Sequence, residues 1–309
     1  SGTMNINAST QNVEITNNLL NPTIVRDSET GEITSVTGGT EADIYNTGIM
    51  NLNANAGKSI TIDSAITDAA TPTGITNVTG AGVVNFNADV TQNTVNVNAG
   101  TVNNTTNAEM TVNTLNNLAQ INNTGAITVN TTLNNTTSIN NDGTLSVYGT
   151  NSLGTITRSD GVATGILNLG NALNNVLTIN KDIQGQTLNL NYGTTRLATT
   201  GTLTGNVGLN ANGAAFDLQN AQRDALILGA VALNSDLSTS IDIALGNKTA
   251  DHLSGSSLSG TSSISLDALN YLEERTYPGN FRELEFCLNQ AVNNSFSEGC
   301  KCLCLRHFL

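Results

Sequence analysis

Short runs of alternating apolar and polar residues follow one another along most of the chain. Examples are SITID at 59–63, TVNVN at 94–98, LNLN at 188–191 and SIDIA at 240–244. Alternation with a period of two is typical of a strand with one face buried. Helical spacing of apolar residues is nearly absent before residue 270. The pattern therefore predicts an all-β chain made of many short strands.

The strand pattern belongs to a longer repeat. INNTGAITV at 121–129 returns as INNDGTLSV at 139–147, and IYNTGIMNL at 44–52 has the same form. An Asn-Thr-Gly or Asn-Asp-Gly turn precedes each alternating run, because Asn and Gly adopt positive φ at low cost. Short strands repeated about every 18 to 24 residues are typical of a solenoid, in which each turn stacks on the one before.

The offset from position 121 to position 139 determines which residues should meet on successive turns. The predicted neighbours are Ile121 and Ile139, Asn122 and Asn140, Gly125 and Gly143, and Val129 and Val147. Aliphatic side chains would form columns inside, and asparagines could pair their amides from turn to turn. We therefore predict a right-handed, single-stranded parallel β-helix over residues 1–270. The main alternative, a β-sandwich or barrel, would use antiparallel strands, two-residue hairpins and larger aromatic cores.

Three segments depart from the repeat. Residues 20–43 are charged and irregular, which predicts a loop that leaves the helix, and residues 65–73 predict a smaller excursion. Residues 271–309 are predicted to be a short irregular or helical tail outside the solenoid. This tail contains all four cysteines, Cys287, Cys300, Cys302 and Cys304. A truncated or shifted reading frame, or a foreign sequence, would explain its composition.

Composition narrows the classes of partner. Charged residues make up 11% of the 309 residues, aromatic residues 4%, and the net charge is −13. Nucleic acids and anionic lipids bind clustered Lys and Arg, so neither is expected as a partner. No apolar run approaches the ~20 residues of a membrane-spanning helix. Regularly placed Val, Ile and Leu argue against disorder.

The Asn/Thr/Gly-rich repeat resembles the passenger domain of autotransporter (type V secretion) proteins, especially surface antigens of intracellular bacteria. Residues 250–266 are similar to the last passenger turns, in which an Asp-x-Leu start, here Asp251 to Leu253, leads into Gly-rich alternation. The resemblance covers about residues 1–270 and rests on periodicity and composition. The alternating start of the chain lacks the features of a signal peptide, so we expect it to begin inside a longer precursor.

The resemblance implies a virulence-associated adhesin or surface antigen at the bacterial cell surface, in the outer membrane or secreted. Its expected partner is a protein or glycan of the host-cell surface. It also implies a translocating outer-membrane β-barrel in the full-length protein. This chain departs from that pattern, since no alternating barrel strands follow residue 270.

Motifs for catalysis are missing from the sequence. It has no Gly-x-Ser-x-Gly, no His-Glu-x-x-His, no phosphate-binding loop and no Gly-Asp-Ser-Gly of the serine-protease autotransporters. His252 is expected on the surface. Cys300, Cys302, Cys304 and His307 could suggest a metal site, but zinc ligands are usually spaced Cys-x-x-Cys. We therefore predict no catalytic residue, no cofactor-binding residue, no metal ligand and no cofactor.

Two alternatives to a non-catalytic adhesin stay open. One is a lyase or hydrolase acting on polysaccharides, which would gather carboxylates on one face of neighbouring turns. The acidic residues are instead dispersed: Asp63, Asp68, Asp89, Glu109, Asp142, Asp160 and Asp182. Asp142 occupies the turn position that Thr124 holds in the earlier repeat, which indicates a turn former. The other alternative is a non-functional truncated product.

Overall fold

The computed structural model describes residues 2–15, 18–20, 23–26, 33–37, 40–159, 165–234, 238–240, 243–244 and 249–260. Within these ranges every regular element is a β-strand. The predicted tail at 271–309 lies outside the described residues, as does its expected helical or irregular character.

Three parallel sheets contain most of the strands. The 14-stranded sheet consists of β1 (Thr3–Ala8), β7 (Ile44–Tyr45), β8 (Ile49–Ala54), β10 (Ile66–Thr67), β11 (Ile75–Thr79), β13 (Val90–Val97), β15 (Glu109–Asn117), β17 (Ala126–Asn135), β19 (Thr144–Val147), β22 (Gly165–Leu169), β25 (Gln186–Leu190), β28 (Gly208–Ala211), β30 (Ala225–Leu233) and β34 (His252–Gly260). The nine-stranded sheet consists of β2 (Val13–Ile15), β9 (Ser59–Ile62), β12 (Val83–Phe86), β14 (Thr101–Asn104), β16 (Gln120–Asn123), β18 (Ser138–Asn141), β21 (Thr155–Thr157), β24 (Asp182–Gln184) and β27 (Thr202–Thr204). The five-stranded sheet consists of β20 (Thr150–Leu153), β23 (Val176–Ile179), β26 (Thr194–Leu197), β29 (Ala215–Asp217) and β31 (Ser238–Ser240).

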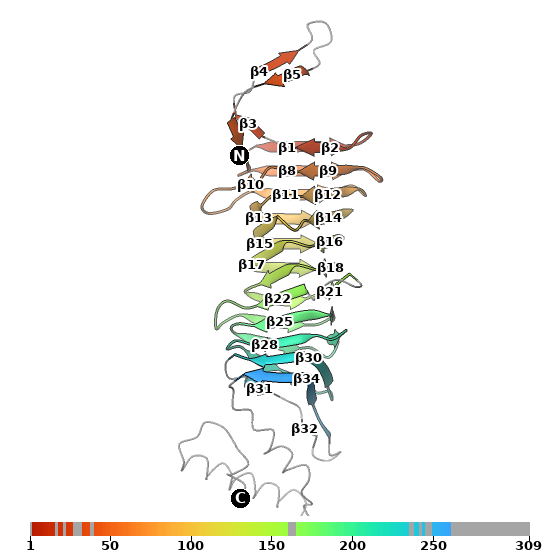
Figure 1. Cartoon of the computed structure of the whole chain (residues 1–309), viewed down its shortest axis with the longest axis vertical. Coiled ribbons are helices and arrows are strands. Elements are labelled where there is room, and N and C mark those ends of the chain that lie inside the picture. The colour runs from red at the N-terminus through yellow and green to blue at the C-terminus, as the bar shows by residue number, and fades with distance from the viewer. Residues whose placement is uncertain are drawn as a thin grey trace, which may run out of the picture.

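Within these three sheets the strands pair with strands of neighbouring rungs, where a rung is one full turn of the chain (Figure 1). Ile121 lies beside Ile139 and Val129 beside Val147, as the offset between the two repeats predicts. All pairs within the three large sheets are parallel. The fold is therefore a parallel β-solenoid, which confirms the predicted fold class.

Each rung has three faces. In the rung at 126–141 the first face is 126–129 and the second is 132–135, both within β17, and the third is β18. The preceding rung changes its burial phase at Asn113 and Thr114, where β15 passes from the first face to the second. We use "second face" below for residues 3–8, 49–54, 75–79, 94–97, 114–117 and 132–135, which pair in that order.

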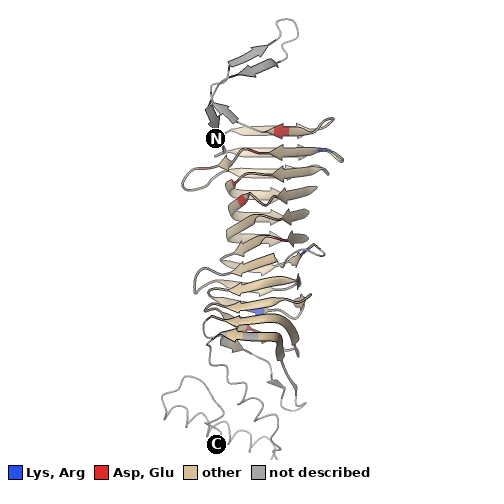
Figure 2. Cartoon of the chain, in the orientation of Figure 1, with Lys and Arg blue, Asp and Glu red and all other residues tan. Residues whose placement is uncertain are grey.

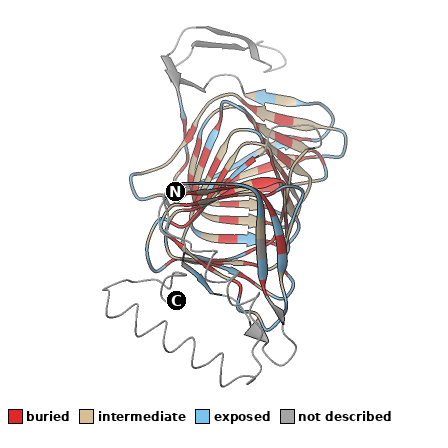
Figure 3. Ribbon diagram, turned by 60° about the horizontal axis from the view of Figure 1, so that its bottom comes forward, coloured by how far each residue is buried: buried red, intermediate tan, exposed pale blue. Residues whose placement is uncertain are grey.

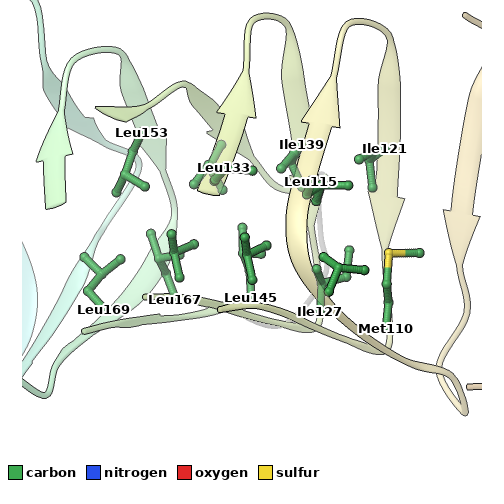
Figure 4. Packing of buried hydrophobic residues seen from close by; sticks show 14 of the residues in the cluster. Met110, Leu115, Ile121, Ile127, Leu133, Ile139, Leu145, Leu153, Leu167 and Leu169 are labelled. Carbon is green, nitrogen blue, oxygen red and sulfur yellow. The ribbon is translucent and has the colours of Figure 1, made fainter. Parts of the chain in front are cut away.

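Aliphatic side chains fill the interior, and buried residues alternate with more exposed ones along most strands of the stack (Figure 3). Ile121 and Ile139 from the third face lie opposite Ile127 and Leu145 from the first (Figure 4). These four side chains are at most 1% exposed. Burial of one such side chain contributes roughly 1.5–3 kcal/mol. A thin, mainly aliphatic core that repeats from rung to rung therefore stabilises the stack, and Phe86 and Phe216 are buried within it.

The segment predicted as a loop at 20–43 contains strands in its described part. β3 (Asn18–Leu20) pairs with β6 (Thr40–Ala42), and β4 (Thr23–Arg26) pairs with β5 (Ile33–Thr37), both antiparallel and outside the stacked sheets. β-Branched residues are frequent in β4 and β5 and favour strands. The prediction of a loop relied on the charged residues of this segment and did not weigh this preference. A further antiparallel pair joins β32 (Ile243–Ala244) and β33 (Thr249–Ala250).

A second loop, at 68–74, is closed by one carboxylate. Asp68 Oδ1 accepts a hydrogen bond from the Ala69 N–H at 2.7 Å. Asp68 Oδ2 accepts from the N–H groups of Thr73 at 2.9 Å and Gly74 at 2.6 Å. Three backbone donors therefore depend on Asp68, and the loop returns the chain to β11 without disturbing the stack.

Replacing Asp68 by alanine is expected to lower the free energy of unfolding by about 1–2 kcal/mol, because several backbone donors lose a charged acceptor. Amide hydrogen exchange at 69–74 should accelerate most. Asp89→Ala is a matched control, since Asp89 accepts one backbone hydrogen bond, from Glu109 at 2.9 Å, and should have a smaller effect. Unchanged exchange at 69–74 would show that Asp68 does not hold the loop.

Candidate binding surface

Asparagines form a line on the outside of the second face, one on each of six successive rungs. They are Asn5, Asn51, Asn77, Asn96, Asn116 and Asn134. From Asn51 onward, the Nδ2 of each donates to the Oδ1 of the asparagine before it, at distances of 2.6–2.8 Å. We name this row the outer asparagine ladder. It forms because the strands alternate: Val95 and Val97 are fully buried, so Asn96 between them points outward.

The ladder presents a fixed row of amides. A side-chain amide has two N–H donors and two acceptor lone pairs. An internal member of the ladder uses one donor and one acceptor in its two ladder bonds, which leaves one of each for a ligand or water. Parallel strands lie about 4.8 Å apart, so the remaining groups recur at that interval along the stack.

A second row runs beside the ladder, at the second position before each asparagine on the same strands. Its members are Thr3, Ile49, Ile75, Thr94, Thr114 and Thr132, which are register neighbours. Three consecutive rungs thus present a threonine next to an asparagine. The side chain of Ile49 is 39% exposed, so the earlier rungs present apolar surface in the same row.

The second face carries no charged residue. Its strands read TMNINA, IMNLNA and ITNVT, followed by TVNV, TLNN and TLNN at 94–97, 114–117 and 132–135. Lys, Arg, Asp and Glu are sparse across the whole described part of the chain (Figure 2). The outer asparagine ladder is therefore a neutral hydrogen-bonding surface.

Shorter ladders occur on the other faces. On the third face Asn103 donates to Asn85 at 2.7 Å and Asn122 donates to Asn103 at 2.9 Å. Asn140 continues the backbone register but donates to Ser159 Oγ at 2.9 Å. The predicted pairing of amides between rungs is thus confirmed in general, while the Asn122 and Asn140 side chains bond to other partners.

A first-face ladder joins three asparagines. Asn189 donates to Asn168 at 2.6 Å, and Asn210 donates to Asn189 at 2.7 Å. These residues are also register neighbours on successive rungs. The first face therefore offers the same chemistry over half as many rungs, which makes it a control for the second.

Several of the dispersed acidic residues accept hydrogen bonds from a neighbouring rung. Asp63 accepts from Asn87 Nδ2 at 2.7 Å, and Asp142 accepts from Ser159 N–H at 2.8 Å. Asp182 accepts from the hydroxyl of Thr202 at 2.8 Å and from that of Thr204. Within the described ranges no three His, Cys, Asp or Glu side chains group as metal ligands would. Asp160 lies outside these ranges.

Asp142 occupies the turn position expected for it. The N–H groups of Asp142 and Gly143 both donate to the Asn123 carbonyl, at 2.8 and 3.0 Å. Thr124 and Gly125 bond in the same way to the Asn104 carbonyl one rung earlier. The two turns have the same backbone hydrogen bonds, which supports the interpretation of Asp142 as a turn former.

The remaining sequence candidates are not brought together. His252 is exposed at the start of β34, as expected, and its N–H donates to the Asp224 carbonyl at 2.7 Å. Cys287, Cys300, Cys302, Cys304 and His307 lie outside the described residues. A cavity of about 430 Å³ at the N-terminal end is lined by Gly2, Thr3, Met4, Ile15 and residues 44–49. None of these described lining residues is a carboxylate, a histidine or a cysteine.

The sequence did not single out the outer asparagine ladder as a site. Its members were recognisable as outward residues of alternating strands, but only the register of unequal rungs aligns all six. No helix among the described residues is long and apolar enough to cross a membrane. Comparisons of the chain with protein-family models, with curated proteins and with solved structures find no match.

Proposed function

We propose that the chain is an autotransporter passenger segment that acts as an adhesin and surface antigen, at the bacterial cell surface or after secretion, without catalysing a reaction. The observation that carries this proposal is the row of ordered, uncharged amides and hydroxyls along the stack. One neutral hydrogen bond contributes only about 0.5–1.5 kcal/mol, so firm binding needs many of them. A repeated surface supplies many at once.

The placement of the carboxylates also supports display over catalysis. Hydrolysis of a glycosidic bond usually needs two carboxyl groups that flank the bond. The described carboxylates that form the contacts above, Asp63, Asp142 and Asp182, accept hydrogen bonds between rungs at separate positions along the stack. These hydrogen bonds give each of the three carboxylates a structural role in the stack.

The purified chain is expected to bind host cells saturably and to leave pectin, alginate and host glycans intact. A variant in which a short Gly/Ser linker replaces residues 20–43 locates the contact. The linker can be short, because Asn18 pairs with Ala42 and the two ends of the excursion lie together. Lost binding would assign the contact to the excursion, and retained binding would assign it to the stack. Clear turnover of any polysaccharide would contradict a non-catalytic adhesin.

A further inference from the structure

We propose that the outer asparagine ladder binds a neutral, extended polysaccharide that lies along the stacking axis. The proposal rests on the adhesin function and names the class of partner that this face would recognise. It concerns the second face alone and does not need the excursion at 20–43.

Hydrogen-bond capacity is the first step. Each internal amide, for example those of Asn77, Asn96 and Asn116, keeps one N–H and one lone pair outside its ladder bonds. A sugar hydroxyl is both a donor and an acceptor, so one hydroxyl pair can satisfy both groups of one amide. A carboxylate or sulfate group only accepts hydrogen bonds, so it would satisfy the amide N–H and leave the amide acceptor unpaired.

Spacing is the second step. Fixed amides recur about every 4.8 Å along the stack, which is close to the length of one sugar in an extended β-linked chain. A straight polymer can therefore follow the row of asparagines over several rungs without bending. The ladder bonds hold each amide in place before binding, so little side-chain entropy is lost on binding.

The neighbouring row supplies the other half of a sugar-binding surface. The hydroxyls of Thr94, Thr114 and Thr132 can bond to hydroxyls at the edge of the sugar ring. On earlier rungs, exposed Ile49 and its register neighbour Ile75 present apolar surface to the C–H face of a ring. Rows of polar and apolar groups side by side match the two kinds of surface on a sugar.

Charge decides between neutral and acidic polymers. The second face has no charged residue to pair with a carboxylate or sulfate, and the whole chain carries a net charge of −13. A polyuronate or a nucleic acid would be repelled at long range and would have to leave its charges unpaired on the surface. A neutral β-linked glycan is not repelled by the net charge of the chain and has no charge to leave unpaired.

The test is co-sedimentation of the whole chain with insoluble cellulose and with chitin, compared with a calcium pectate gel. We expect retention on at least one neutral polymer and none on pectate. Asn96→Thr with Asn116→Thr should weaken retention at least about tenfold, which corresponds to 1.4 kcal/mol. Asn189→Thr with Asn210→Thr removes two ladder amides from the first face and should leave retention unchanged.

A milder variant separates binding from folding. Thr94→Val with Thr114→Val keeps every ladder amide and should weaken retention severalfold, while thermal unfolding stays close to that of the native chain. Equal retention by native and second-face variants, or retention on neither neutral polymer, would overturn the proposal. So would equal losses from both faces. Host-cell binding that persists in the second-face variants would leave the adhesin function standing and remove this ligand.

Discussion

Gly143→Ala is expected to lower the free energy of unfolding by about 3 kcal/mol, although it adds a single methyl group. A Cβ built on Gly143 would lie 2.1 Å from the carbonyl oxygen of Gly125 and 2.8 Å from that of Thr124. Both atoms belong to the backbone of the preceding rung, so no side chain can rotate away. The two rungs would have to separate, which weakens hydrogen bonds on either side of the turn.

Gly57→Ala is the matched control. Gly57 has a φ of +72° and no atom within 4 Å of a built Cβ. Its replacement therefore costs only the strain of a left-handed conformation, about 1–2 kcal/mol. Denaturant unfolding, with amide exchange at 124–126, would measure both variants. Equal losses would show that the rungs at Gly125 and Gly143 are not in close contact.

The contact between Gly143 and Gly125 could be predicted from the sequence. Two nearly identical segments, at 121–129 and 139–147, each have a glycine after the same Asn-containing turn, which predicts that Gly125 and Gly143 stack. The structure confirms this register at Ile121 and Ile139 as well. Where rungs have equal length, an exact repeat is enough, because a slip by one residue would turn the aliphatic side chains outward.

Rungs of unequal length could not be aligned in this way. Ile49 pairs with Ile75, a longer step along the chain than that from Ile121 to Ile139, because the loop at 68–74 is inserted at a corner and leaves the faces unchanged. An inserted loop increases the number of residues between paired positions but leaves the pairing of the strands unchanged. The outer asparagine ladder crosses this rung, so its length became visible only in the structure.

Pairs of adjacent asparagines were a second feature that side-chain polarity alone could not place inside or outside the stack. Asn103 and Asn104 are identical in chemistry, yet Asn103 belongs to a ladder on the outside and Asn104 is 1% exposed inside. Hydrophobicity does not distinguish them. Alternation from the buried Val102 turns Asn103 outward and Asn104 inward, where Asn104 Nδ2 donates to the Ala126 carbonyl at 2.9 Å and to Asn123 Oδ1 at 2.8 Å. Strand alternation therefore assigns the side of each asparagine, and tertiary hydrogen bonds make it possible to bury the second one.

Inside the stack these contacts form a buried ladder. Asn104 donates to Asn123 and Asn123 donates to Asn141 Oδ1 at 2.7 Å, after which Asn141 donates to Gln186 Oε1 at 2.8 Å. Phe86 occupies the register position before Asn104, and Asn104 Oδ1 has no hydrogen-bond partner. The buried ladder thus begins with one unsatisfied acceptor, and its remaining polar atoms depend on every member staying an amide.

Asn123→Asp should therefore have the largest effect of any change to a ladder, a loss of about 3–5 kcal/mol at pH 7. Asn123 is fully buried, and its Nδ2 donates to Asn141 Oδ1 at 2.7 Å and to the Thr144 carbonyl at 2.9 Å. A carboxylate would place oxygen against two acceptors and bury a charge that keeps the neutral amide of Asn104 as a donor but has no counter-charge among these contacts. Asn134→Asp is the control, because its single ladder bond, to Asn116, is exposed and the carboxylate can rotate into water.

The pH dependence separates the buried charge from lost packing. Burial among acceptors should raise the pKa of the new carboxyl in the folded state above its unfolded value of about 4. The penalty is then absent below that value, where the carboxyl is protonated in both states, and it grows as the pH rises towards the folded pKa. From pH 7 to pH 5, still above the sequence pI of 4.3, the deficit relative to the native chain should shrink by up to about 1.4 kcal/mol for each unit. Urea unfolding at the two pH values measures it. A deficit that stays constant would mean that the residue at 123 is open to water and that the amides inside the stack are not a continuous ladder.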